Sequence, residues 1–157
     1  MKILDKNGLS GLMEKLIWII FFAECAAVIF LPWILEFLIY FSGKIAPPIS
    51  NDYYYQLLIL MYFTFLLGIP FTWQIKGILK NINNKKPFIE DNVQRLKLLS
   101  IFSVLLAVGY FVGFFFVPSF FVPLMFLLFM LMGLFLKVCS ELFLQAVKYK
   151  EENELTV

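Results

Sequence analysis

The residues best placed to do chemistry in this chain are charged side chains within long apolar segments. Glu24 lies nine residues after Lys15, and Lys137 lies eleven residues before Lys148. Because a helix rises about 1.5 Å per residue, both charges are expected roughly 13 to 17 Å inside their segments. A charge at that depth costs on the order of 2.5 to 3.5 kcal/mol on insertion scales. We therefore expect Glu24 and Lys137 to form an intramembrane ion pair, with Glu141 one turn further on sharing the lysine.

Two roles are open for this polar group. A structural pair that fixes the register of the first and fourth helices is favoured, and a proton-coupled or ligand-binding carboxylate at Glu24 is the alternative. The sequence has no histidine, no serine or cysteine beside a base, no metal-ligand cluster and no phosphate-binding loop. Cys25 and Cys139 fall within apolar runs and are expected to be small hydrophobic side chains. We therefore expect no enzymatic activity, no cofactor and no metal.

Four apolar runs must position these charges, and they cover residues 16–41, 53–73, 98–117 and 120–146. Each is near or above the roughly 20 residues needed to cross a hydrocarbon core of about 30 Å. Composition agrees, since 62% of residues are apolar and 15% are charged, against about a quarter charged in soluble domains. No stretch between the runs is long enough to bury a core of its own. The sequence predicts one all-α domain over residues 1–157, an integral membrane four-helix bundle surrounded by the lipid bilayer.

Basic residues predict how these helices are oriented. Of the 13 Lys and Arg residues, 12 fall where the four runs place them on one side of the membrane, and only Lys44 lies opposite. Because positive loops stay in the cytoplasm, we expect a multi-pass membrane protein with both termini and residues 74–97 in the cytoplasm. The net charge of +2 is too small for a nucleic-acid footprint, so direct binding of DNA or RNA is not expected.

Residues 74–97 are predicted to form a bent cytoplasmic helical hairpin. Apolar residues recur at helical spacing over 75–82, and Asn83 and Asn84 are expected to end this helical extension. Asp91 or Asn92 can cap the helix that follows. Two readings are open, a basic connector that lies on the membrane surface and a docking surface for a cytoplasmic partner.

Small residues within the spans predict close helix packing. Gly109 and Gly113 form a small-xxx-small pair in the third span, and Gly133 lies in the fourth. In the second span, Gly68 and Pro70 are expected to interrupt the helix. Packing is the favoured explanation for these residues, and a small polar pocket beside the intramembrane carboxylate is the alternative.

Two short motifs resemble a known family. Residues 81–96 read NINNKKPFIEDNVQRL, and residues 150–157 read KEENELTV. A PF-x-x-x-NV-x-RL segment between the second and third spans and a terminal ELTV are typical of the YoaS-like family of uncharacterised bacterial four-helix membrane proteins, which this chain resembles. The resemblance implies a place in the bacterial cell membrane. It also implies pairing with a very small cytoplasmic helix-turn-helix DNA-binding protein, and hence membrane-linked control of transcription.

The predicted function is therefore that of a non-enzymatic membrane regulatory module. Its expected partner surface comprises Phe88, Arg95, Lys97, Glu151, Glu152 and Glu154. One alternative is an immunity or envelope-stress protein that meets a membrane-active peptide through the aromatic outer turn at 117–123. Another is a small proton-coupled transporter that uses Glu24. The sequence leaves open the signal, the partner's identity, the role of Glu24 and whether the chain forms a homo-oligomer.

Overall fold

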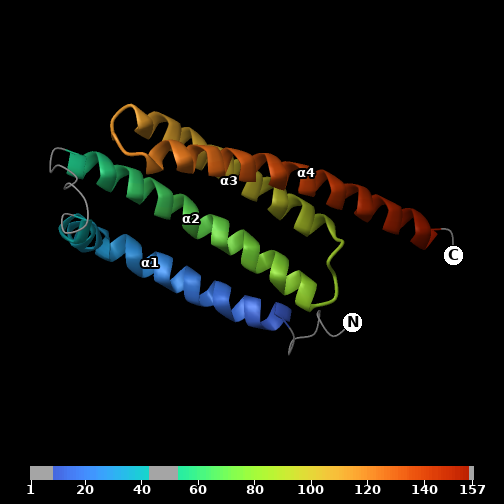
Figure 1. Cartoon of the computed structure of the whole chain (residues 1–157). Helices are drawn as coiled ribbons and strands as arrows, with labels where there is room; N and C mark the ends of the chain where they lie inside the picture. Colours follow the sequence, from blue (N-terminus) through green and yellow to red (C-terminus); the bar gives the residue numbers. More distant parts are fainter. Residues whose placement is uncertain (1–8, 43–52, 156–157) are drawn as a thin grey trace.

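The computed structural model describes residues 9–42 and 53–155 (Figure 1). Within those ranges it contains no strand and four helices, α1 (Leu9–Ser42), α2 (Tyr54–Asn83), α3 (Glu90–Phe114) and α4 (Phe121–Leu155). All four include a stretch long and apolar enough to cross a membrane. The predicted all-α class with four potential membrane spans is therefore confirmed.

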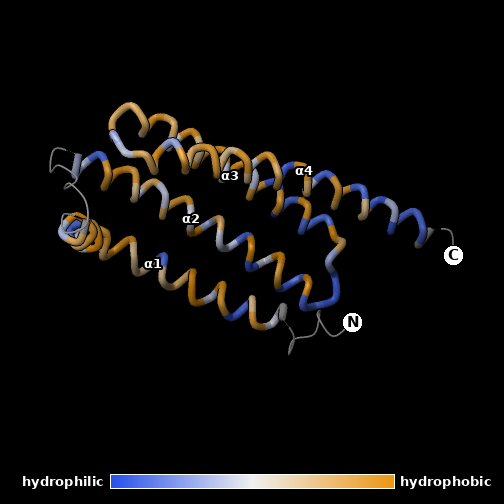
Figure 2. Tube along the Cα trace, in the orientation of Figure 1, coloured by the Kyte–Doolittle hydropathy of each residue, from blue (hydrophilic) through white to orange (hydrophobic). Residues whose placement is uncertain are grey.

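The helices pack in chain order, α1 against α2, α2 against α3 and α3 against α4. Consecutive helices run in opposite directions, so the start of α1, the connection from α2 to α3 and the end of α4 lie at one end (Figure 1). Hydrophilic residues gather there (Figure 2), and we call this the polar end, comprising residues 9–18, 74–97 and 137–155. The turn between α3 and α4 lies at the opposite end.

The end of α2 follows from its sequence. The helix runs without a break through Gly68 and Pro70, so the predicted interruption there is wrong. It ends at Asn83, as the asparagine pair predicts, and the backbone N–H of Asn84 donates to carbonyls of the last turn. Lys85 then adopts a left-handed backbone with φ of 60°. This conformation is uncommon for a residue with a Cβ atom, and it turns the chain sharply away from the helix axis.

The start of α3 differs from the sequence-based prediction. The helix begins at Glu90, and the residue before it, Ile89, makes no side-chain capping bond. Asn92 lies within the first turn instead, and its Nδ2 donates to the carbonyl of Pro87 at 2.7 Å. The prediction that Asp91 or Asn92 caps this helix is therefore wrong. Asp91 in the first turn still interacts favourably with the positive end of the helix dipole.

The most extensive helix contact lies between α3 and α4. Val104, Ser103 and a backbone carbonyl of α3 approach Gly133 so closely that a Cβ there would lie 2.9 Å from Val104 Cγ2. The hydroxyl of Ser100 donates to the carbonyl of Gly133 at 2.8 Å. This bond fixes the register of the two helices and places Lys137, one turn along α4, level with Leu96 of α3.

The two glycines of α3 serve the contact with α2. A Cβ at Gly109 would overlap the ring of Phe63, and a Cβ at Gly113 would lie 3.2 Å from a methyl group of Leu60. Glycine therefore lets α2 side chains lie directly against the α3 backbone. The packing role predicted for these glycines is confirmed.

Candidate functional site

Glu24 projects from α1 against α2. Its Oε1 accepts a hydrogen bond of 2.9 Å from the hydroxyl of Thr72. The approach is close because Gly68 lies one turn along the same face of α2, where a Cβ would stand 3.5 Å from Oε1. The other oxygen, Oε2, is buried and has no hydrogen-bond partner among the described residues. The free oxygen of this side chain can still accept a hydrogen bond, take up a proton or bind a small cation.

A cavity of about 210 Å³ adjoins this carboxyl group. Glu24 and Thr64 are polar residues in its lining, and Phe129 of α4 is among the apolar ones. The hydroxyls of Thr64 and Tyr110 lie 3.0 Å apart, and the ring of Tyr110 stacks on Phe129 with centroids 5.5 Å apart. Side chains from all four helices thus surround or support a small, mostly apolar chamber with one acidic group. No group of three or more metal-binding side chains occurs in the described part of the chain.

The structure does not bring Lys137 to Glu24. The Nζ atom of Lys137 lies 3.3 Å from Glu141 Oε1, and the two side chains are 55% and 59% exposed. Lys137 stands level with Leu96, among the charged residues that precede the apolar run of α3, whereas Glu24 is bonded to α2. Depth counted along each helix could not predict this, because it ignores both the direction of a side chain and the stagger between helices. The intramembrane polar group is therefore Glu24 with Thr72.

A second polar constellation joins α2 to α3 at the polar end. The amide nitrogen of Asn81 donates to Asp91 Oδ2 and to Asn92 Oδ1, both at 2.7 Å. Arg95 binds Asp91 through Nε at 2.8 Å and Gln74 through Nη1 at 3.1 Å. Three of these four bonds connect α2 to the first turns of α3, and the bond between Arg95 and Asp91 lies within α3. We call them the α2–α3 brace.

Arg95 belongs to this brace more than to the predicted partner surface. A Cβ at Gly77 would overlap the Arg95 guanidinium group, so the side chain lies across the glycine of α2. It is 25% exposed, whereas Lys97 on the same helix is exposed. The sequence pattern placed both residues on a solvent-facing side because it could not reveal the space above Gly77.

The other predicted surface residues are spread along the polar end. Phe88 is 45% exposed, and its ring lies against Phe143 of α4 with centroids 5.6 Å apart. Glu151 and Glu152 are exposed on the last turns of α4. The side chain of Glu154 lies outside the described part of the structure. The phenylalanine anchors the connection to α4. The end of α4, which carries the acidic residues, extends beyond the α2–α3 connection (Figure 1).

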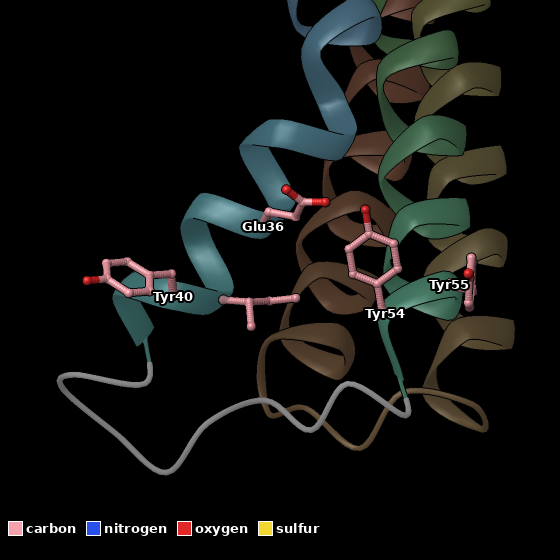
Figure 3. A pocket seen from close by; sticks show the side chains of 5 residues that line it. Glu36, Tyr40, Tyr54 and Tyr55 are labelled. Carbon is pink, nitrogen blue, oxygen red and sulfur yellow. The ribbon is translucent and has the colours of Figure 1, made fainter.

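The opposite end offers a cavity but no converging set of groups. It measures about 520 Å³ and is lined by Glu36, Ile39, Tyr40, Tyr54 and Tyr55. Glu36 and Tyr54 face each other across the gap between α1 and α2, whereas Tyr40 and Tyr55 point to the outer sides of their helices (Figure 3). The aromatic turn beyond α3 is also open, with Phe120 and Phe121 exposed.

The sequence contained only weak signals for several residues that the structure brings together. Gly68 and Thr72 are four residues apart, which places a small and a polar residue on one face of α2. Asn92 was predicted only as a possible helix cap, and no contact was predicted for Asn81. Lys76 lies between two aromatic rings, with Nζ 3.5 Å from the centroid of Trp18 and 3.9 Å from that of Trp73.

Comparisons with known proteins identify a family but no activity. No curated protein and no solved structure matched the chain. A family described as "Protein of unknown function (DUF2975)" matches residues 42–157. The match begins at the last residue of α1 and includes α2, α3 and α4. Because it covers well over half of the sequence, the chain belongs to this uncharacterised family.

Proposed function

We propose that this chain is a non-enzymatic regulatory protein of the bacterial cell membrane, and that its polar end meets a small cytoplasmic helix-turn-helix DNA-binding protein. The α2–α3 brace is the observation that carries the proposal. Polar groups at an exposed helix end can be satisfied by water, so a simple connector needs no such network. A braced, charged surface suits the docking of a protein partner. The class of partner rests on the family resemblance of the two sequence motifs.

The contact surface in this proposal is centred on Lys97 and Phe88. Both are exposed, whereas Arg95 holds the helices behind them in place. The acidic end of α4, with Glu151 and Glu152, supplies charge of the opposite sign. A partner that contacts both regions would sense the position of α4 relative to α3.

Orientation is the first requirement of this proposal. The charge map depends partly on Lys2, Lys6 and Lys44, which lie outside the described residues. Topology reporters fused after Leu79 and after Val157 should both read as cytoplasmic, and a reporter near Pro48 should read as external. A strong external signal at either of the first two positions would overturn the orientation.

Site-specific crosslinking tests the partner directly. A photoreactive amino acid at Lys97 should capture a small DNA-binding protein in intact cells, and mass spectrometry of the adduct would identify it. Val108 provides the matched control, since it is exposed on the same helix but lies in the apolar run. Capture of lipid or unrelated membrane proteins alone at both positions would count against the regulatory function.

Variants then distinguish residues that contact the partner from residues that only stabilise the contact surface. With the photoreactive amino acid placed at Phe88, Lys97→Glu or deletion of residues 151–157 should abolish capture and leave the melting temperature near that of the parent. Arg95→Glu should lower stability as well, because it breaks the brace. Glu24→Gln should leave capture intact.

Proton-coupled transport is the second candidate, favoured by the unpartnered Oε2 of Glu24 beside a cavity. In liposomes carrying a pH gradient, a transporter of this kind should lose proton-coupled flux in Glu24→Gln and keep it in Lys137→Met. If Glu24→Gln alone erases such a flux while all variants capture partners like the parent, the transporter replaces the regulator.

A further inference from the structure

A groove of about 450 Å³ lies between the start of α1 and the end of α2, at the polar end. Lys15 and Glu14 of α1 line it on one side, and Lys80 and Asn83 of α2 on the other. The groove is distinct from the α2–α3 brace and from the cavity beside the intramembrane carboxyl group. Its lining combines cationic groups with oxygen acceptors.

The cations of this groove are available to a ligand. Lys15 and Lys80 are exposed, and no carboxylate lies within ion-pair distance of either in the part of the chain that the structure describes. Lys76 stands nearby, between Trp18 and Trp73. Three ammonium groups against the single carboxylate of Glu14 give this region a net positive charge, which favours an anion.

An acceptor in the groove also lacks its donor. Asn83 is 6% exposed, and its Nδ2 donates to Glu14 Oε2. Its Oδ1 is buried and has no hydrogen-bond partner among the described residues. A buried carbonyl oxygen without a donor costs on the order of 1 to 3 kcal/mol. A ligand that carries a hydroxyl group beside its anion would satisfy this oxygen.

The position of the groove points to lipid. Tryptophan side chains gather where hydrocarbon meets headgroups. Trp18 lies near the start of the first apolar run and Trp73 at the end of the second, and their rings flank Lys76. The groove residues Lys80 and Asn83 lie one and two turns beyond Lys76 on α2, toward the polar end, at the level expected for phosphates. Exposed Leu12, Leu16 and Ile19 on α1 offer apolar surface for acyl chains.

We infer that this groove binds one anionic phospholipid whose headgroup carries hydroxyl donors. Lys15 and Lys80 hold the phosphodiester, as basic pockets between membrane helices do, and a headgroup hydroxyl donates to Asn83 Oδ1 or to Glu14. The site is separate from the proposed regulatory surface, and its existence does not depend on that function.

Native mass spectrometry of the full chain, titrated with single lipids in detergent, tests this site. Phosphatidylglycerol should bind as one retained molecule. Phosphatidylethanol has the same charge without the hydroxyls and should bind more weakly, and zwitterionic phosphatidylcholine should bind weakest. This ranking is measured on the unaltered protein, so it does not depend on any variant folding.

Paired variants locate the lipid. Lys15→Gln with Lys80→Gln should weaken phosphatidylglycerol binding about thirtyfold, because two ammonium–phosphate attractions are lost. Lys97→Gln with Lys148→Gln removes the same charge from exposed positions on α3 and α4 and should change affinity less than about threefold. Retained helicity and melting temperature would show that both double variants fold.

Three results would overturn the inference. Equal binding of phosphatidylglycerol and phosphatidylcholine to the parent would show that the groove does not select an anion. Equal weakening by the two double variants would show diffuse attraction without a site. Displacement of the lipid by millimolar inorganic phosphate, which then binds with similar affinity, would assign the groove to a free phosphate and not to a headgroup.

Discussion

The contact between α1 and α2 is polar and open, whereas the contact between α3 and α4 is small-residue packing. Glu24 with Thr72, Glu14 with Asn83, and Lys76 with two tryptophans all lie between the first two helices. Between the last two, Ser100 and Gly133 bring the backbones together. In α3, eight residues are buried, but few are in α1. The described structure thus combines a tightly packed pair with a looser pair that holds two unpartnered buried oxygens, Glu24 Oε2 and Asn83 Oδ1.

The α3–α4 contact mainly stabilises the fold, whereas the α1–α2 contact holds the atoms that could bind a ligand or a proton. In a membrane, close backbone approach contributes van der Waals packing that lipid cannot supply equally well. Unsatisfied oxygens at Glu24 and Asn83 instead reduce stability until a ligand or proton reaches them. The family match includes the whole α3–α4 pair but only the α2 side of the other contact. The α1 partners of both polar sites lie outside it.

The largest expected effect is at the tightly packed pair. Gly133→Leu should destabilise the protein by about 2 to 3 kcal/mol, because the new side chain collides with Val104 and separates Ser100 from its acceptor. Gly68→Leu is the matched control at the looser α1–α2 pair and should cost less, since a Cβ there lies no closer than 3.5 Å to Glu24 Oε1, an ordinary van der Waals distance. Unfolding in detergent, followed by circular dichroism, measures both. Similar losses in the two variants would remove the contrast in packing.

The next effect tests the pairing of Glu24. Thr72→Val should cost about 1 to 2 kcal/mol, because it leaves a partly buried carboxyl oxygen without its donor. A double-mutant cycle of Thr72→Val with Glu24→Gln should show coupling, since the side chains are bonded. A cycle of Glu24→Gln with Lys137→Met should show none. Coupling in the second cycle alone would restore the ion pair predicted from the sequence.

A smaller effect is expected at the brace between the two pairs. Arg95→Ala should lower stability by about 1 kcal/mol, because it removes charge-assisted bonds to Asp91 and Gln74 at a partly exposed site. Lys97→Ala on the same helix should change stability by less than about 0.5 kcal/mol. Chemical unfolding of both variants provides the measurement. Equal losses of stability in the two variants would mean that the brace stabilises the protein no more than an ordinary exposed charge does.

The smallest effect concerns the lysine between the tryptophans. Lys76→Met should cost about 0.5 to 1 kcal/mol in lost cation–π attraction. It should also change the fluorescence of Trp18 and Trp73 in a Trp33→Phe background, where these two are the remaining tryptophans. Unchanged emission would show that the ammonium group does not stay between the rings.

Sequence patterns predicted the elements better than the contacts. Apolar run length reveals a membrane helix, and the pair Asn83–Asn84 marked the end of α2 correctly. The pairing of Glu24 could not be predicted, because depth along a helix says nothing about the face a residue occupies. Arg95 was misplaced for a related reason, since the space above Gly77 exists only once α2 and α3 are packed. The sequence predicts the length of a helix and where it ends, but it does not predict the stagger between helices.

Packing in chain order has a consequence for biosynthesis. Each helix finds a principal neighbour in the segment translated immediately before or after it. The α1–α2 contact can therefore form while the ribosome is still producing α3, and α4 needs no helix other than α3 to complete its main contact. Native contacts between successive segments keep the entropic cost of loop closure low. Helix packing can thus proceed hairpin by hairpin as the chain is synthesised, because each described helix has its main contact with an adjacent one.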